Sequence, residues 1–508
     1  MVYYIGSFSH PINQQEIIHI QDPAQTESLR AGDVIERWDH VLEWDENCLK
    51  ASQLEEWRGT GDPLCDEALK SMFPSSSSSV GIDLLKRLEE DAQTNPQGPS
   101  KAFLDHAMRL PPDDIAASKE EILLAQTFYL RHSVAIMQSL MHFSLAGGFA
   151  SPRITRVLQS VSYLLPSSKY QSREMTEQMN NRTFSRLLET SQFILDVMGC
   201  MDPYAPMSDT IGCLKPEGEG WKAALRVRLL HGIARKRIME KLNSSSNVYN
   251  TEKDGIPINQ EDMAATLGSF SVAPLWCLSR LYPIPIPVST AGEEAAFIAT
   301  WRHIGFYLGV DPGILRAHFS SSVNATKFLS STIIHLLTSY PDEQYYFPPT
   351  MPVLRAISGR PPFPKTLAHH CALTRRLLGN SMSTYLGVPS TSILENIRVL
   401  KDCVMMQLPI LFACYYPRQG WDQTRLTLLR ATVPRVIRSQ LGLRRTVFRA
   451  RTETGEIAEG VMAEESVQPD PVGAKKLMRG WWMLLIEMAA AICGFLIIPV
   501  GITWKLYT

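Results

Sequence analysis

A single histidine, His231, interrupts the apolar face of a stretch whose composition predicts a helix. The stretch, Trp221–Glu240, contains no proline and one glycine, and its basic residues crowd the C-terminal half, where the helix dipole favours cations. At helical spacing, the apolar residues that share the face of the histidine are Ala224, Val227, Ala234 and Ile238. Arg228 and Arg235 lie three residues before and four residues after the histidine. An imidazole with guanidinium groups alongside suits a haem, because it offers a nitrogen ligand to iron and cations to the propionates.

A plainer interpretation of the same stretch stays open, namely a buried histidine hydrogen-bonded to a carbonyl group on a helix whose arginines are solvated. The other histidines are weaker candidates for chemistry. His369 and His370 are neighbours, so on a helix their side chains point about 100° apart, and His132 and His142 are ten residues apart. The sequence contains no P-loop, no G-x-S-x-G, no H-E-x-x-H and no paired Glu-x-x-His pattern. His231 is therefore the best single candidate for a metal ligand.

Length and composition narrow the class of protein. A chain of 508 residues can bury a large core, and 50 Lys and Arg balance 51 Asp and Glu, which gives no reason to expect a nucleic-acid partner. The nine cysteines are scattered without a C-x-x-C pair, so neither a disulfide framework nor a zinc site is indicated, and a reducing compartment suits them. The N-terminal segment has no basic run followed by a long apolar one, which predicts no signal peptide.

The elements that must position these residues are predicted to be helices. Nearly every apolar pattern has the helical period, and no convincing set of alternating strands is found. The clearest helical stretches are Glu120–Ala146, Ser151–Leu165, Glu174–Gly199, Trp221–Glu240, Pro257–Phe270 and Glu293–Gly309. Helix starts are indicated at Asp62-Pro63 and at Asn259. We therefore expect an all-α fold with one large domain over residues 51–450, preceded by a polar N-terminal extension over residues 1–50.

The C-terminal part of the chain has a different composition. Trp481–Trp504 carries Glu487 as its one charge and is long enough to span a hydrocarbon core of about 30 Å as a helix. Aromatic residues stand at both of its ends, and three basic residues precede it between positions 475 and 479, which predicts that the preceding chain faces the cytosol. We expect a linker over residues 451–478 and a transmembrane tail anchor over residues 479–505; the alternative is a buried C-terminal helix.

A set of short motifs carries a resemblance to a known family. The motifs are Gly61–Asp66 (GDPLCD), Ser144–Leu164 (SLAGGFASPRITRVLQSVSYL), Arg186–Thr190 (RLLET), Arg226–His231 (RVRLLH), Pro257–Met263 (PINQEDM), Trp301–Gly305 (WRHIG), Leu308–Val310 (LGV) and Arg376–Gly379 (RLLG). No single motif is specific. Their ordered set, over most of residues 54–390, resembles the family of fungal endoplasmic-reticulum-bound oxygenases of mycophenolic acid biosynthesis and bacterial rubber oxygenases, the latex clearing proteins.

The resemblance implies a haem b protein with a globin-like helical core and additional helices. The proximal iron ligand of the family is the histidine of an R-x-x-H segment, which corresponds to His231. Arg228, with Arg235 as a further candidate, would then pair with the haem propionates. A neutral histidine leaves the opposite side of a ferrous haem open to dioxygen.

The resemblance also implies residues on the oxygen side of the haem. The distal arginine and threonine of the family correspond to Arg186 and Thr190, and an arginine there can stabilise negative charge on oxygen. The rubber oxygenases have a lysine just before that threonine, where this sequence has Glu189. A glutamate base would lie upstream of the arginine; Glu174 and Glu177 are both candidates, and neither matches the family spacing cleanly.

Together these implications predict a haem-dependent oxygenase, tail-anchored in the endoplasmic reticulum with its catalytic domain in the cytosol. Its expected partners are dioxygen, the membrane and a lipophilic isoprenoid or polyketide-type intermediate of secondary metabolism, which it would oxidise by cleavage of a carbon–carbon double bond. One alternative is a haem oxidase or monooxygenase that cleaves no chain. The other is a non-catalytic, membrane-tethered helical binding or scaffold protein, which the glutamate at position 189 keeps open.

Overall fold

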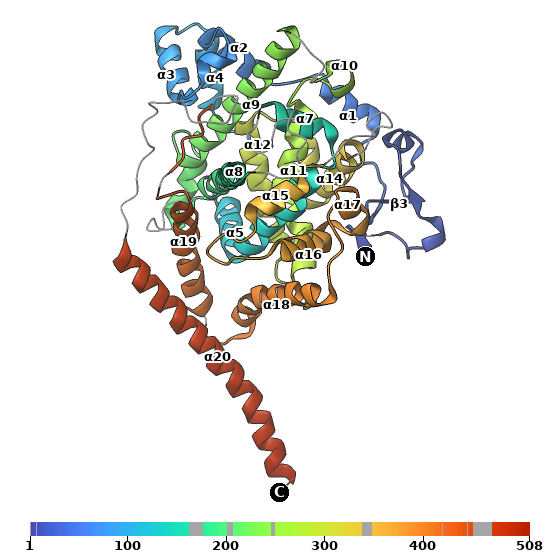
Figure 1. The fold of residues 1–508 in the computed structure, drawn as a ribbon, viewed down its shortest axis with the longest axis vertical. Helices are drawn as coiled ribbons and strands as arrows, with labels where there is room; N and C mark the ends of the chain where they lie inside the picture. Colours follow the sequence, from blue (N-terminus) through green and yellow to red (C-terminus); the bar gives the residue numbers. More distant parts are fainter. Residues whose placement is uncertain are drawn as a thin grey trace.

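Three long helices packed side by side form the centre of the molecule. The computed structural model describes residues 2–6, 8–161, 176–200, 207–244, 249–337, 348–418, 420–443, 445–450 and 470–507. Helix α5 (Lys119–Ser139) lies against α12 (Ala291–Leu308), and α11 (Gln260–Leu281) contacts both (Figure 1). Each of the three begins with a capping box, in which the N-cap side chain and the acidic side chain three residues later satisfy each other's backbone N–H groups. These caps explain why the helices begin where they do.

Helix α5 does not end as a regular α-helix. It continues through one π-helical segment, Leu140–Leu145, into the short α6 (Ala146–Gly148). The helix expected over Glu120–Ala146 is therefore confirmed, with an insertion in its last turns that the apolar periodicity does not show. Such π-segments widen the helix and redirect the side chains that follow.

The helix that carries His231 is confirmed and is longer than expected. Helix α9 spans Glu219–Ser244 and packs against α8 (Glu177–Val197), α12 and α2 (Pro63–Met72). Helix α2 begins after the N-cap Asp62, whose Oδ1 accepts a hydrogen bond from the backbone N–H of Cys65 at 3.3 Å. The expected helix over Glu174–Gly199 is confirmed from Glu177 onwards.

Shorter helices surround this centre. They are α1 (Ala51–Arg58), α3 (Leu84–Thr94), α4 (Pro99–Ala107), α7 (Pro152–Val161), α10 (Thr251–Asp254), α13 (Pro312–His318), α14 (Ser322–Leu336), α15 (Thr350–Ile357), α16 (Leu367–Leu378), α17 (Asn380–Tyr385), α18 (Ile393–Tyr415) and α19 (Gly420–Gln440). One contiguous apolar core runs beneath them from Leu49 to Ala450. The prediction of an all-α main body is confirmed.

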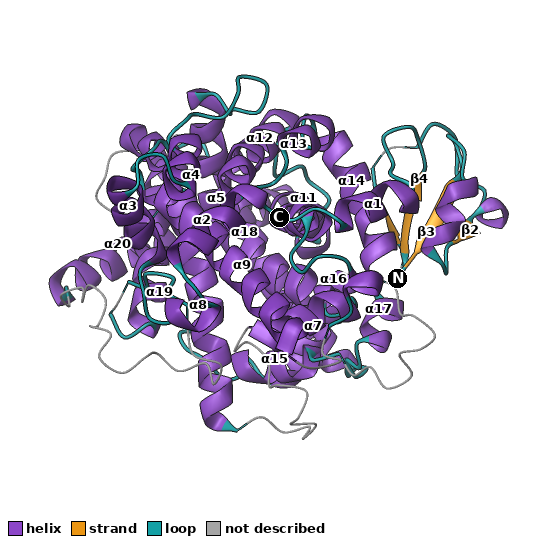
Figure 2. Cartoon of the chain, turned by 90° about the horizontal axis from the view of Figure 1, so that it is seen from above, coloured by secondary structure: helices purple, strands orange, loops and turns teal. Residues whose placement is uncertain are grey.

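The N-terminal residues form a small sheet, which corrects the expectation that the sequence contains no strands. The strands are β1 (Tyr3–Tyr4), β2 (Ile18–His19), β3 (Val34–Arg37) and β4 (His40–Glu43), in the order β1-β4-β3-β2. They are too short to produce a readable alternation of apolar and polar residues. The buried side chains of Ile35 and Leu42 pack with Ile334 of α14, so the sheet is attached to one side of the helical body (Figure 2).

The last element, α20, leaves the helical body. It spans Pro471–Tyr507, so its first residues lie within the expected linker, and residues 451–469 lie outside the described chain. Among the described residues, α20 is the one helix long and apolar enough to cross a membrane, over Pro471–Gly494. Figure 1 shows it running along α19 and then projecting beyond α18. The apolar C-terminal helix is thus a candidate membrane anchor.

Candidate active site

His231 lies deep in the structure and yet is not fully enclosed. Its ring is partly accessible, as are Val227 and Ala234 on the same face of α9, whereas Ala224 and Ile238 at the two ends of that face are 1% and 2% exposed. Burial, followed by the positive charge of Arg235, lowers the pKa of His231 to about 4. The imidazole is therefore neutral at physiological pH, which is the protonation state that a metal ligand requires.

The hydrogen bonding of His231 is incomplete. Its Nδ1 is buried and has no hydrogen-bond partner among the residues that the structure describes. A buried polar atom without a partner costs free energy, so this nitrogen could make a further interaction. The simpler interpretation, a histidine hydrogen-bonded to a carbonyl group, finds no such contact for Nδ1 in the described chain.

Arg235, one turn after the histidine, is only partly satisfied. Its Nε donates to the carboxylate of Asp66 at 2.9 Å and 3.0 Å, and its Nη1 donates to the carbonyl oxygen of Ile258 at 2.7 Å. Its Nη2 is buried without a partner among the described residues. Two consecutive turns of α9 thus present an imidazole nitrogen and a guanidinium nitrogen that lack partners.

Arg228 lies in a different environment. Its Nε and Nη2 donate to the two carboxylate oxygens of Asp62 at 2.6 Å and 2.9 Å, and its guanidinium lies 4.8 Å from the centre of the Phe103 ring. Burial raises the pKa of Asp62, but the charge and hydrogen bonds of Arg228, together with the charge of Arg235, hold that pKa below its ordinary value. Arg228 therefore fastens α9 to the start of α2, and its pairing with a propionate stays a prediction.

The two residues expected on the oxygen side lie on α8, which packs directly against α9. Thr190 is exposed on a helix whose next residues are buried, and its Oγ1 donates to the carbonyl oxygen of Arg186 at 3.2 Å. Arg186 forms an ion pair with Glu189, which is 5% exposed. The two residues thus lie on a helix that contacts the helix of His231, and the glutamate neutralises part of the charge of Arg186.

An aromatic wall stands next to Thr190. The rings of Phe193 and Phe270 meet edge to face with centroids 6.3 Å apart, and Phe270 lies 5.3 Å from Trp301 of α12. Thr266 of α11 lies one turn before Phe270 and is exposed. Of the six residues around it, three on each side, five are buried and none is exposed. Thr190 and Thr266 thus flank one aromatic contact. The second threonine was not among the predicted site residues, although its spacing from Phe270 places both on one helix face.

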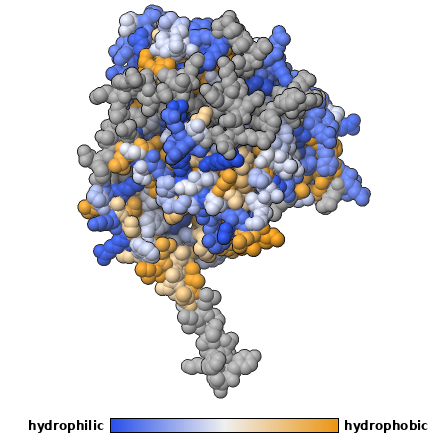
Figure 3. Space-filling view, viewed as in Figure 1, coloured by the Kyte–Doolittle hydropathy of each residue, from blue (hydrophilic) through white to orange (hydrophobic). Residues whose placement is uncertain are grey.

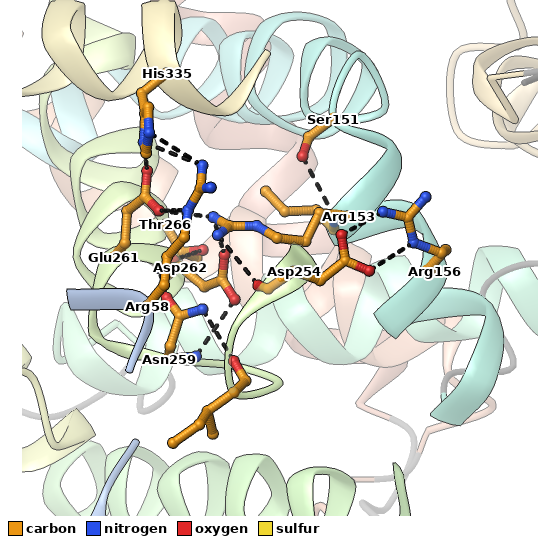
Figure 4. Close-up of polar contacts among 12 residues, drawn as sticks. Arg58, Ser151, Arg153, Arg156, Asp254, Asn259, Glu261, Asp262, Thr266 and His335 are labelled. Atoms are coloured by element: carbon orange, nitrogen blue, oxygen red, sulfur yellow. Dashed lines mark hydrogen bonds and ion pairs between the residues drawn. The ribbon is translucent and has the colours of Figure 1, made fainter. Parts of the chain in front are cut away.

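A buried ion network secures the helix that carries Thr266 (Figure 4). Glu261, fully buried, accepts from Arg58 Nε and Arg153 Nη2, each at 2.9 Å, and lies 2.5 Å from His335 Nδ1. Arg153 Nη2 also donates to Asp262 at 2.8 Å. Burial raises the pKa of Glu261, but Arg153 and its other partners lower it to about 2, so the carboxylate is charged. The network joins α1, α7, α11 and α14.

The other candidate glutamates and histidines lie away from His231 in the sequence and have their own surroundings. Glu174 lies outside the described residues, and Glu177 is exposed in the first turn of α8. His142 Nδ1 lies 2.8 Å from Thr374 Oγ1, and His132 Nδ1 lies 3.0 Å from Tyr282 Oη. Within the described ranges, no three His, Cys, Asp or Glu side chains gather to hold a metal ion.

Comparisons with known proteins show the family of the chain. The family described as "ER-bound oxygenase mpaB/B'/Rubber oxygenase, catalytic domain" matches residues 129–463, which include α8, α9 and α11. The solved structure of latex clearing protein LCP in the closed state aligns with 70% of this chain and 83% of its own, at 16% identity and a TM-score of 0.45. No curated protein sequence matches the chain.

Proposed function

The chain belongs to the family of ER-bound mpaB/B'-type oxygenases and rubber oxygenases and is an oxygenase, and from this premise we propose that it is a haem b-dependent enzyme acting on a lipophilic small molecule at a membrane. The substrate class is an isoprenoid or polyketide-type intermediate of secondary metabolism. The cytosolic body is held at the endoplasmic reticulum by the C-terminal helix.

One observation carries the haem assignment. His231 Nδ1 and Arg235 Nη2 are buried without partners among the described residues on consecutive turns of one helix, and the histidine is held neutral. His231 would hold the iron of a haem, and Arg235 would pair with one of its propionates. The residues present therefore fit the cofactor, which, when bound, supplies a redox-active iron at which dioxygen is reduced.

The residues of the chain have separate tasks in this proposal. Arg186 and Thr190 supply a guanidinium and a hydroxyl near the oxygen, and Glu189 limits the positive charge of the arginine. Phe193, Phe270 and Trp301 provide an apolar wall that excludes water and accepts a lipophilic chain. The proposed reaction is oxidative cleavage of a carbon–carbon double bond by dioxygen, which yields two carbonyl fragments.

Two alternative functions differ from this proposal in their expected products. An oxidation without cleavage would change the substrate mass by oxygen or hydrogen units in one product, so product mass separates it from cleavage. A binding or scaffold role is favoured by the Arg186–Glu189 ion pair, because it weakens the one cation expected on the oxygen side. Haem-containing protein that consumes no oxygen with any lipophilic substrate would support that role.

The decisive experiment is an absorption spectrum with a pyridine haemochrome assay of the purified full-length protein. We expect a Soret band and stoichiometric haem b, and loss of both in His231→Ala. The matched control is His106→Ala, because His106 is also partly buried with an unpartnered, buried Nδ1 among the described residues but lies on α4. Stoichiometric haem retained in His231→Ala would eliminate the axial assignment, and a folded, colourless wild type would eliminate the cofactor.

A further inference from the structure

Helix α18 exposes apolar side chains over its first half and again at its C-terminal end. Its exposed apolar side chains, here called the α18 stripe, are Ile393, Leu394, Ile397, Leu400, Met405 and Tyr415. Exposed fractions reach 79% at Ile393 and 57% at Ile397. The opposite face, which includes Val399, Cys403 and Ile410, is buried against the body. An exposed patch of this extent marks an interaction surface.

Cations accompany the stripe. Two exposed basic residues lie on the same side of α18: Arg398 at an edge of the stripe and Lys401 within it. Lys365 pairs with Asp402 of α18, and Phe363, two residues before that lysine, is 80% exposed. Long basic side chains that extend past apolar ones, with an aromatic ring alongside, are typical of helices that lie in a membrane interface.

The base of the C-terminal helix is joined to the end of α18. Glu487 of α20 accepts a hydrogen bond from Tyr416 Oη at 3.1 Å and from Arg418 Nη1 at 2.5 Å, and both partners directly follow α18. Trp481 Nε1 donates to Thr432 Oγ1 of α19 at 2.8 Å, and Leu484 is 4% exposed. One face of α20 therefore contacts the body as far as Glu487, whereas Trp482 and Ile486 on its other face are exposed. We place the start of the membrane span after this glutamate.

The part of α20 beyond Glu487 has the length of a span. Residues 488–507 read MAAAICGFLIIPVGITWKLY and, at about 1.5 Å per residue, extend about 30 Å, the thickness of a hydrocarbon core. The bilayer surface then coincides with Glu487, and so with the C-terminal end of α18. Figure 1 shows α18 lying across the end of the body from which α20 emerges, and Figure 3 shows apolar surface gathered around that end.

We infer that the α18 stripe is a membrane-contacting surface, which lies in the headgroup region of the bilayer that the tail of the same chain enters. This inference rests on the proposed membrane anchoring and refines it: the span is residues 488–507, residues 471–487 are a docked stalk, and α18 is a second contact. Two contacts fix the orientation of the body, so that the same end of the molecule always faces the lipid.

A bilayer is favoured over a protein partner by two observations. The stripe is continuous, through the Glu487 contacts, with the one described helix that is apolar and long enough to enter a membrane. Its exposed cations Arg398 and Lys401, which also pair with Glu395 and Asp402 of α18, can meet anionic lipid headgroups.

The test uses full-length protein in liposomes containing phosphatidylserine, with a fluorophore on one cysteine and nitroxide-labelled lipids as quenchers. Among the nine cysteines, Cys414 and Cys493 are exposed. Two labelled proteins lack both exposed cysteines (Cys414→Ser, Cys493→Ser) and carry either Ile397→Cys or Leu110→Cys. A third carries only Cys414→Ser and is labelled at the native Cys493. Leu110 is the matched control, because it is 61% exposed and comes three residues after α4, a helix that Figure 1 shows at the opposite end of the body from α18.

We expect the label at position 397 to lose about half of its fluorescence to nitroxides near the headgroup, as a residue at the acyl boundary does. The label at Cys493 should be quenched as well, and the label at position 110 should not. If the label at Cys493 is quenched but the label at position 397 is quenched no more than the label at position 110, the α18 inference is overturned and the anchor stands. No quenching at Cys493 would overturn the anchor itself, and concentration-dependent shielding at position 397 without lipid quenching would identify a second copy of the chain as the occupant.

Discussion

The guanidinium of Arg186 forms an ion pair with the carboxylate of Glu189, one turn further along α8, and both side chains are largely buried. The rubber oxygenases that this sequence resembles have a lysine at the position of the glutamate. The ion pair therefore replaces a second cation with an anion next to the arginine. This reduces the positive potential around Arg186.

Removing the glutamate charge should restore that potential. We predict that Glu189→Gln binds the anionic ligand azide to the ferric protein about five-fold more tightly, corresponding to about 1 kcal/mol for one partly buried charge. Titration by absorption spectroscopy measures the dissociation constant. Glu177→Gln, exposed in the first turn of the same helix, is the control and should leave azide binding unchanged. Equal affinity in the Glu189 variant and wild type would place Arg186 away from the iron.

Arg228 and Arg235 of α9 should differ in their effect on the cofactor. We predict that Arg235→Gln lowers haem affinity about ten-fold, because it removes a buried donor that has no partner among the described residues, and that Arg235→Lys recovers part of the loss. Arg228→Gln should instead reduce the stability of the apoprotein, since it leaves the buried carboxylate of Asp62 without its cation. Haem titration and urea unfolding separate the two effects. If Arg228→Gln lowers haem affinity more than Arg235→Gln does, Arg228 is the partner of the propionate.

The network around Glu261 should contribute strongly to stability. Arg153→Met leaves Glu261 and Asp262 without the cation that touches both, and we expect the free energy of unfolding to fall by about 3–5 kcal/mol. Urea denaturation of the full-length protein in detergent measures the change. Arg316→Met, which removes the exposed ion pair with Asp114, is the matched control and should have little effect. A similarly small effect of Arg153→Met would show that the network is not needed for the fold.

The stability of the haem-free protein should fall as the solution becomes mildly acidic. Burial lowers the pKa of His231 and His303 to about 4 and that of His132 to about 3, so the folded state keeps these rings neutral. The unfolded chain takes up protons on them below about pH 6.5, so the free energy of unfolding decreases as the pH falls from there towards about 4. Urea midpoints between these values measure the slope. His231→Gln should reduce the slope, whereas His10→Gln, an exposed control, should not.

Much of the helical architecture follows directly from local patterns in the sequence. The helix of His231, the start of α2 at Asp62-Pro63 and the cap of α11 at Asn259 were predicted correctly, because periodicity and capping depend on residues within one or two turns. The same holds for the apolar C-terminal helix. Strands of two to four residues leave no comparable pattern, which is why the N-terminal sheet was missed.

The partners of the charged side chains depend on the tertiary fold. Arg228 was predicted from its spacing to His231, but its carboxylate partner Asp62 is 166 residues away, and Arg153 reaches Glu261 across 108 residues. The exposure of the α18 stripe is equally a tertiary result, because an amphipathic helix buries only the face that other elements cover. Local sequence specifies which residues share a helix face, whereas long-range packing decides what that face meets, since a contact between distant segments requires both to be in place.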